Sequence, residues 1–529
     1  MKYPDVSGGG GGVSLAWILG LSIGGGFVLF VALVALYDVL QTQHAILRNF
    51  PIVGHFRYWL EAIGPELRQY IVTSNTEERP FNRDQRRWIY SSAKQENSYF
   101  GFGTSEDLEM TPNYIILKQS SFPLSSPERG QPGFDPEYTL PSAKVLGGFR
   151  GRKKAFRPNS VVNISGMSFG SLSGNAVMAL NQGAKLAGCL QSTGEGGLSP
   201  YHQQGGDIVW QLGTGYFGAR GQDGQFNMEI VKEVCAANPV RAIEVKLSQG
   251  AKPGHGGLLP AAKVTKEIAA IRGIPEGVDC HSPAGHSAFH DVDGLLDFVE
   301  RLADETGLPV GIKSAVGQME FWDQLAQRSV DTGRGVDFVT IDGGEGGTGA
   351  APLVFTDHVA QPFKVGFAQV YATFARHGIH EDVTFIGSGK LGFPESAVLA
   401  FGLGCDMVNV AREAMMAIGC IQAQRCHTGH CPTGVATQSQ WLQRGLAPDV
   451  KAPRMANYVR ALRKDLLSLS NACGVEHPAL LTPGHVDILD DRFGSRPLAE
   501  VFGYDPGWGL PREEEREAIR RIMTDKYRI

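Results

Sequence analysis

The sequence predicts an α/β protein built on a (β/α)₈ barrel, preceded by a transmembrane helix and an α+β extension. Two observations predict the barrel. From about residue 160, apolar runs of strand type alternate with helical stretches eight times, which is the repeat number of such a barrel. Glycine-rich strings follow several of these runs, at 193–197, 254–257, 343–349 and 387–392. A third observation, an uncharged stretch at residues 13–37, predicts the membrane helix.

The N-terminal region combines a glycine-rich segment with a long apolar stretch. Residues 1–12 are glycine-rich and predict a flexible segment. Residues 13–37 would form a helix of about 37 Å, enough to cross a hydrocarbon core of roughly 30 Å. This apolar segment is also longer than the apolar region of a secretory signal peptide. A buried core helix is the alternative. Only Lys2 precedes the stretch, whereas arginines follow it: Arg48, Arg57, Arg68, Arg79, Arg83, Arg86 and Arg87. We therefore expect a single-pass membrane protein with its catalytic domain in the cytoplasm.

Residues 38–155 mix aromatic residues with arginines and predict an interfacial, partly helical extension, or else an ordinary α+β cap on the main domain. Residues 156–445 form the predicted barrel domain, and residues 446–529 a helical tail that ends in a charged helix. The predicted strands are 161–165, 190–193, 242–247, 278–282, 309–313, 336–341, 383–386 and 407–410. The predicted helices include 174–186, 261–271, 292–305 and 321–330. A doubly wound sheet is the alternative, but its Gly-x-Gly-x-x-Gly turn is missing after the first strand.

Composition excludes several classes of protein. Of 529 residues, 42% are hydrophobic and 19% are charged, which suits a large folded core and not a disordered chain. The net charge of −5 gives no support to nucleic-acid binding. Eight cysteines are too few for a disulfide scaffold. The 68 glycines have no collagen period, so they indicate tight turns and close backbone approaches to a ligand.

The strings after the last two predicted strands indicate a phosphate site. Loops after strands seven and eight of a barrel commonly bind phosphate. Backbone N–H groups of Ser388, Gly389 and Lys390 would face the anion, and Arg412 would add positive charge. A plain turn is the alternative. With no dinucleotide motif elsewhere, the pattern favours a mononucleotide such as FMN. We assign the neighbouring rim positions to the same cofactor: Thr193, Gly344, Gly346, Gly347 and Ala411.

Two lysines end apolar strands. Lys313 ends the predicted fifth strand and Lys246 the predicted third. A buried ammonium without an anionic partner is costly, so each should meet an anion. The electron-rich edge of a reduced flavin is one such partner, and a neighbouring carboxylate is the other.

Three cysteines carry a redox signal. Cys420, Cys426 and Cys431 form C-x5-C-x4-C, followed by proline. Three thiolates without a fourth suit a three-iron cluster better than tetrahedral zinc, although His427 or His430 would complete a Cys₃His zinc site.

These residues resemble a known family. The strings MSFGSLS, STGEGG, QGAKPGHGG, GGEGGTGAAP and GCIQAQRCHTGHCPTGVATQ, within about 165–445, resemble the FMN-binding synthase region of the glutamate synthase large subunit. With its apolar helix, the whole chain is similar to membrane-tethered bacterial proteins of the FMN-binding glutamate synthase family. The resemblance implies a (β/α)₈ barrel, FMN, a [3Fe–4S] cluster on the three cysteines, and 2-oxoglutarate and ammonia as substrates.

The resemblance also implies roles for individual residues. Met167 and Ser168 match the segment against the flavin ring, and Lys313 the lysine at its N1 side. Lys246, Gln249 and Lys252 match residues near flavin and 2-oxoglutarate. Glu195 matches the acid near the point where ammonia meets the keto acid, so Glu195, Lys252 and Lys313 are the expected catalytic residues. The chain departs from the family pattern at four positions: His255, Gly344, Glu345 and Tyr216.

The expected reaction is reductive amination of 2-oxoglutarate to L-glutamate. Electrons would come from a ferredoxin-like or membrane donor, because no direct NAD(P)H site is expected. The chain begins Met1-Lys2, without the N-terminal cysteine nucleophile of a glutaminase, so the nitrogen would come from ammonia, another amine or a partner glutaminase. The alternatives are a flavin enzyme acting on another imine or amine, as in N-methylglutamate synthesis, a membrane-tethered flavin and iron–sulfur electron-transfer protein, and a flavin-free barrel dehydrogenase with Cys431 as nucleophile.

Overall fold

The computed structural model describes residues 15–97, 99, 101–109, 111–492 and 494–526. The predicted flexible segment 1–12 therefore lies outside the described residues. The chain forms two compact units, Met1–Arg83 and Asp84–Ile529, and each is described by itself.

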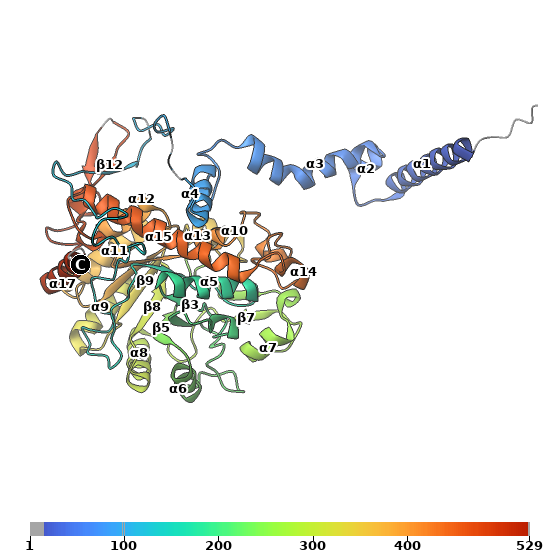
Figure 1. The fold of residues 1–529 in the computed structure, drawn as a ribbon. Coiled ribbons are helices and arrows are strands. Elements are labelled where there is room, and N and C mark those ends of the chain that lie inside the picture. The colour runs from blue at the N-terminus through green and yellow to red at the C-terminus, as the bar shows by residue number, and fades with distance from the viewer. Residues whose placement is uncertain (1–14, 98, 100, 110, 493, 527–529) are drawn as a thin grey trace, which may run out of the picture. The chain divides into compact units, whose positions relative to one another are not determined.

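The first unit contains a long apolar helix and a shorter second helix (Figure 1). The predicted membrane helix is present as α1, Leu15–Leu40. Its stretch Trp17–Leu40 is long and apolar enough to cross a membrane, and the most apolar 18 residues of this stretch have no buried member. The remaining elements are α2, Ala45–Asn49, α3, Val53–Leu67, and a π-helical turn η1, Arg68–Val72.

The second unit is built on a closed barrel of eight parallel strands, in the order β10-β11-β2-β3-β4-β5-β8-β9. The strands are β2 Val162–Ile164, β3 Gln191–Ser192, β4 Ile208–Leu212, β5 Val240–Lys246, β8 Val310–Ser314, β9 Phe338–Asp342, β10 Thr384–Ser388 and β11 Met407–Val410. Pairing of Val408 with Val162 closes the barrel. The predicted (β/α)₈ barrel is thus confirmed.

One predicted barrel strand is wrong. Residues 278–282 lie outside the barrel, where β7, Cys280–Ser282, pairs antiparallel with β6, Gly257–Leu259. In β7, Cys280 is buried and His281 exposed, the alternation of a strand with one free face, whereas barrel strands are buried on both faces. The missing member is β4, Ile208–Leu212. Lys246 consequently ends the fourth strand in chain order, not the third.

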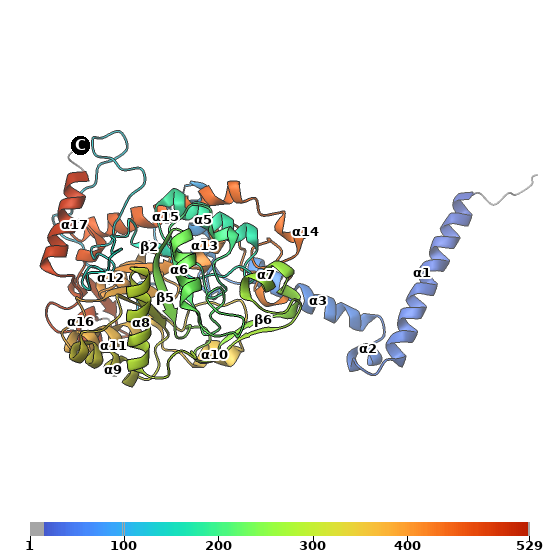
Figure 2. The same ribbon diagram turned by 90° about the horizontal axis from the view of Figure 1, so that it is seen from below.

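Helices surround the strands in both views (Figures 1 and 2). Their ends follow capping rules: Ser173 accepts a hydrogen bond from Ala176 N at the start of α5, and Gly188 ends this helix with a φ of 64°. The helices are α5 Gly174–Ala187, α6 Met228–Ala237, α7 Lys266–Arg272, α8 Val292–Thr306, α9 Glu320–Thr332, α10 Leu353–His358, α11 Phe363–Arg376, α12 Pro394–Gly402 and α13 Arg412–Ala417.

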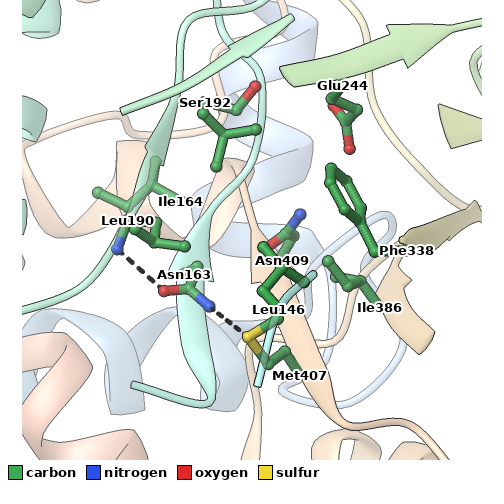
Figure 3. A pocket seen from close by; sticks show the side chains of 11 residues that line it. Leu146, Asn163, Ile164, Leu190, Ser192, Glu244, Phe338, Ile386, Met407 and Asn409 are labelled. Carbon is green, nitrogen blue, oxygen red and sulfur yellow. Dashed lines mark hydrogen bonds between the residues drawn. The ribbon is translucent and has the colours of Figure 1, made fainter. Parts of the chain in front are cut away.

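The barrel interior changes from apolar to polar along the strands. Near the strand starts, Leu146 from the preceding segment packs with Phe338 and Met407 and fills this end of the barrel interior. Farther along, Glu244 lies in a small cavity that also borders Asn163 (Figure 3). Thr340 Oγ1 donates a 2.7 Å hydrogen bond to Glu244, and Gln211 Nε2 donates another. This interior cavity shares no lining residue with the cavity at the rim.

The part of the extension from Asp84 onward and the tail belong to the second unit, together with the barrel. β1, Ile115–Leu117, pairs with β12, Val486–Leu489, which pairs with β13, Ser495–Pro497. Helix α15, Pro448–Ala472, crosses α5 where Gly183 has no side chain, since a Cβ there would lie 2.7 Å from Met455 Cε. The other helices are α4 Arg83–Lys94, α14 Gln440–Gln443, α16 Leu498–Phe502 and α17 Glu513–Lys526.

Candidate active site

The predicted site residues meet at the carboxyl ends of the barrel strands. Lys246 and Ser388 are the last residues of β5 and β10, and Lys313 lies one residue before the end of β8. The loops that follow the strands carry most of the others, and Arg412 is the first residue of α13. The loop residues are Met167, Ser168, Thr193, Glu195, Gln249, Lys252, Gly344, Gly346, Gly347, Gly389, Lys390 and Ala411. This rim is where barrel enzymes hold their active sites.

A polar chain joins three loops of the rim. Lys246 Nζ lies 3.0 Å from Glu195 Oε1 and donates a 3.3 Å hydrogen bond to Gln249 Oε1. Gln249 Nε2 in turn donates to Gly347 O at 2.8 Å. Glu195 fits because Gly213 has no side chain: a Cβ there would lie 2.6 Å from Glu195 Cβ. The loops after β3, β5 and β9 are therefore held together by these contacts.

The protonation of Glu195 follows from its neighbours. Burial alone would raise the pKa of Glu195, but the ammonium groups of Lys246 and Lys252 outweigh it and hold this pKa below its usual value. Glu195 is therefore a carboxylate at neutral pH.

Lys252 borders a cavity at the rim, together with Glu195, Thr214, Ser248 and Gln249. Its side chain is buried, and among the described residues its ammonium has no hydrogen-bond or ion-pair partner. Burial and the positive charge of Lys246 lower the pKa of Lys252. A buried cation without a partner is suited to binding an anion that enters the cavity.

Lys313 has a carboxylate partner, which was one of the two partners expected for it. Its Nζ lies 3.6 Å from Asp342 Oδ2 and 3.4 Å from Ser165 Oγ. The same Asp342 oxygen accepts a 2.9 Å hydrogen bond from Gly250 N. Burial would raise the pKa of Asp342, but Lys313 and the Gly250 N–H lower it below its usual value.

The two glycine-rich loops after β9 and β10 touch each other. Gly343 N donates a 2.8 Å hydrogen bond to Ser388 O. Gly389 has a φ of 121°, and a Cβ there would lie 3.0 Å from Gly343 N. A Cβ on Gly347 would lie 2.5 Å from Arg412 Cδ, and Arg412 donates to Glu345 O. The positive φ of Gly389 favours glycine at this close approach, and the two loops and Arg412 lie together at the rim; phosphate binding there stays a prediction.

The loops after β2 and β3 pack with equal closeness. A Cβ on Gly194 would lie 2.6 Å from Ser168 N, and Met167, Ser168 and Thr193 are all buried. Arg272, which the sequence did not single out, donates from Nη2 to Phe169 O at 3.2 Å and to Ser168 Oγ at 3.4 Å. Its guanidinium is buried and adds a further positive charge near Glu195.

Tyr216, one of the departures from the family pattern, is buried in a hydrogen-bonded chain. His286 Nε2 lies 2.9 Å from Lys246 O, so this nitrogen carries the proton, and Nδ1 accepts from the Tyr216 hydroxyl at 2.9 Å. Ala288 N donates to the same hydroxyl at 3.2 Å. Burial lowers the pKa of His286, which keeps the ring neutral. Tyr216 and His286 thus position the backbone that carries Lys246.

Cys420, Cys426 and Cys431 follow α13, but their side chains are not arranged as a metal-binding site. Among the described residues, no group of three His, Cys, Asp or Glu side chains is placed to hold one metal ion. The thiols nevertheless influence one another. Burial raises the pKa of Cys420 to about 12, and negative charge on Cys426 and Cys431 adds to this. Burial opposes ionisation of Cys431 too, but N–H groups at Thr433, Val435 and Ala436 lower its pKa overall.

The segment after Cys431 is bonded to the loop after β2. Ser173 Oγ donates to Gly434 O at 2.7 Å, and Ser173 N donates to Val435 O at 2.9 Å. Gln438 Nε2 donates to Gly170 O at 3.1 Å and to Leu172 O at 2.9 Å. The cysteine segment and the loop that carries Met167 and Ser168 therefore form one hydrogen-bonded layer.

Sequence reasoning missed three residues of this region. Asp342 stands one residue beyond the predicted strand 336–341, and an acid at a strand end was a signal that could have found it. Arg272 and His286 lie outside the motifs described above, and no sequence pattern indicates that they belong to this site.

Comparisons with known proteins agree with this architecture. The family model described as "Conserved region in glutamate synthase" matches residues 149–476. The chain is 38% identical over 501 residues to the glutamate synthase large subunit-like protein YerD of Bacillus subtilis, covering 89% of this chain and 94% of that protein. It is 37% identical over 320 residues to the archaeal glutamate synthase [NADPH] of Methanocaldococcus jannaschii, covering 59% of each.

Similarity to solved structures is lower. Flavocytochrome b2 with sulfite bound has a TM-score of 0.43 and 13% identity, covering 87% of this chain and 90% of that one. The fold assignment rests on the closed barrel itself. Since the family model covers most of the chain and the relative from Bacillus subtilis aligns along nearly its whole length, the chain belongs to the glutamate synthase family, as a large subunit-like member.

Proposed function

We propose that the barrel catalyses a glutamate synthase-type reaction, in which 2-oxoglutarate and ammonia are converted to L-glutamate with FMN as the resident cofactor. The observation that carries the proposal is the rim cavity, where the ion pair of Lys246 and Glu195 lies beside the unpartnered ammonium of Lys252. The paired groups supply a fixed carboxylate for proton transfer. The unpaired one supplies a binding point for an acidic substrate.

The residues present fit FMN. Gly389 and Gly347 leave a surface that a Cβ would fill, so backbone can approach the cofactor closely. Ser388, Gly389, Lys390 and Arg412 would hold the phosphate. The buried lysine Lys313 and its neighbours would meet the ring and its chain: Met167, Ser168, Thr193, Lys246, Gln249, Gly344, Gly346, Gly347 and Ala411.

When bound and reduced, FMN supplies the hydride that the substrate carbon accepts. The side chains of this protein prepare the substrate. Lys252 binds a carboxylate of the keto acid, which keeps its carbonyl in one orientation. Glu195 takes a proton from the attacking ammonia and returns it as water leaves, a role for which an ionised carboxylate is required. Tyr216 and His286 hold the Lys246 backbone, and Lys246 keeps Glu195 ionised.

We propose that Cys420, Cys426 and Cys431 hold a [3Fe–4S] cluster that passes electrons toward the flavin. The donor set fits a cluster in its chemistry, because three cysteine thiols lie within twelve residues of the chain and backbone N–H groups at Thr433, Val435 and Ala436 approach Cys431. Cys426→Ser should lower the iron content and the visible absorbance of the purified protein, with Cys473→Ser as a matched control. A variant with full iron and activity would contradict the assignment.

The proposed partners follow from the same chemistry. A ferredoxin-like or membrane donor would supply electrons, and solution ammonia, another amine or a separate glutaminase would supply nitrogen. We propose that α1 spans the membrane and places the second unit in the cytoplasm, since arginines follow the helix.

A second candidate reaction uses another amine in place of ammonia. The observation that favours it is Tyr216, whose hydroxyl is engaged by His286 and Ala288 and brings no charge to the cavity. Arg272 and Lys252 are then the cations left for the substrate.

The test uses the full chain in detergent or nanodiscs. Flavin and iron are quantified first, and then 2-oxoglutarate with ammonia is compared with 2-oxoglutarate plus primary amines, with dithionite as reductant. Glutamate formed only with ammonia supports the first proposal, and an N-alkyl product supports the second. Reversible reduction without any product would contradict both and indicate an electron-transfer protein.

A further inference from the structure

The corner between α1 and α3 is closed by a buried carboxylate. Asp38, near the end of α1, is fully buried and accepts a 2.8 Å hydrogen bond from Ile52 N. His55 Nε2, in the first turn of α3, lies 2.8 Å from Asp38 Oδ1. Gln41 Nε2 bridges Asp38 O and His44 O, at 3.0 and 2.8 Å. The start of α3 is therefore fixed to the end of α1, and the chain turns sharply there (Figures 1 and 2).

Helix α3 has one apolar face. Six apolar side chains recur at helical spacing along it: Val53, Phe56, Trp59, Leu60, Ile63 and Leu67. Five of them are exposed, among them Phe56 at 58% and Trp59 at 59%. Beside this stripe, Arg57 Nε pairs with Glu61 Oε1 at 3.0 Å, and the helical spacing places Tyr58, Ala62 and Pro65 opposite it. An exposed apolar stripe with aromatic residues, flanked by a charged pair, suits a helix that lies in a membrane interface.

We propose that α3 lies in the lipid headgroup region, with the face of Phe56, Trp59 and Leu60 buried in the bilayer next to the end of the α1 span. The inference rests on the proposed span of α1, to whose end the start of α3 is bonded at the Asp38 corner. Arg48 and Arg68 flank the helix and suit anionic headgroups. With Arg57, Glu61 and Glu66 the segment is close to neutral, so apolar contact dominates and zwitterionic lipid should suffice.

Trp59 provides the measurement. The full chain is placed in nanodiscs of phosphatidylcholine, with either plain or brominated acyl chains, and fluorescence of the wild type minus that of Trp59→Phe isolates Trp59. We expect brominated lipid to remove more than half of the Trp59 emission. The matched control carries the probe on the other face, in Trp59→Phe/Glu61→Trp, and should be quenched much less. Trp441→Phe isolates an exposed tryptophan of the second unit that should not be quenched.

The outcomes separate this inference from the span itself, because Trp17→Phe reports on α1 in the same discs. Quenching of Trp17 without quenching of Trp59 would overturn the interfacial helix and leave the span standing. No quenching of Trp17 would refute the span. A blue-shifted Trp59 emission that brominated lipid leaves unchanged would mean that protein covers this face, and would also overturn the proposal.

A second variant pair tests the stripe directly. Phe56→Asp with Leu60→Asp should reduce the quenching of Trp59 at least twofold, whereas Arg57→Gln with Glu61→Gln should leave it unchanged. Equal quenching in both pairs would contradict the orientation of the helix. Flavin content of each variant, measured alongside, shows that the second unit is folded.

Discussion

The barrel has two buried polar regions, and they treat charge differently. In the interior, Glu244 receives hydrogen bonds from two neutral donors, Thr340 and Gln211, and apolar side chains close the space beneath it. At the rim, Lys246 and Lys313 are each paired with a carboxylate, and Lys252 is left without one. A satisfied buried group stabilises the fold, whereas an unsatisfied one costs stability and is kept where it binds a ligand.

Breaking an ion pair at the rim should cause the largest change in the free energy of unfolding. Asp342→Asn leaves Lys313 buried without a counter-charge, and we expect a loss of about 3–5 kcal/mol of unfolding free energy. Chemical denaturation measures it. Adding Lys313→Met to this variant should restore much of the loss, since both charges are then gone. A single variant as stable as the wild type would show that solvent already satisfies Lys313.

Removing the unpaired ammonium of Lys252 should lower activity without lowering stability. Lys252→Met should keep or raise the melting temperature, because a costly buried charge disappears. A hydrogen bond to a charged group is worth roughly 1.5–3 kcal/mol, so kcat/KM for the keto acid should fall about 10- to 100-fold. Activity with dithionite and thermal unfolding are measured together. Loss of both activity and stability would mean that Lys252 is structural.

A smaller effect is expected in the interior. Glu244→Gln keeps the shape, and its amide group can donate to the Thr340 hydroxyl while its oxygen accepts from Gln211; both hydrogen bonds become neutral, at a cost of about 1 kcal/mol. Denaturation should detect it, and activity should not change. A large fall in activity at unchanged stability would show that the interior region takes part in the reaction.

The smallest effect concerns acid stability. The folded-state pKa of Glu195 lies below its usual value of 4.5, so its ionised form stabilises the fold above that pH. This contribution should be lost as the pH falls below about 4.5 toward the folded-state pKa. Glu195→Gln should flatten the pH dependence of unfolding free energy in that range. An identical profile for both proteins would contradict the ion pair with Lys246.

The sequence was enough to predict the barrel, because eight repeats of strand and helix leave a strong period. The sequence also predicted that these residues share one edge of the barrel, because parallel strands in a closed barrel end at the same edge; their roles stay predictions. The sequence could not show which of two segments, β4 or the segment around Cys280, is a strand of the barrel. Both are short and bounded by turn residues, and only their pairing in space distinguishes them.

The contacts among the site residues were harder to predict than their location. The pairing of Lys313 with Asp342 depends on the register of β8 against β9, which aligns Lys313 with Thr340 and sets Asp342 beyond it. The bond from His286 to the Lys246 backbone joins residues 40 positions apart. Such distances are fixed by how strands and loops meet, and residue spacing along the chain carries no trace of them.

The bonded layer between the cysteine segment and the loop after β2 has a mechanical consequence. Ser173 and Gln438 join the two segments by four hydrogen bonds. The proposed cluster site and the loop that carries Met167 and Ser168 are thus directly connected, so a shift of the cysteine segment would be transmitted to this side of the rim.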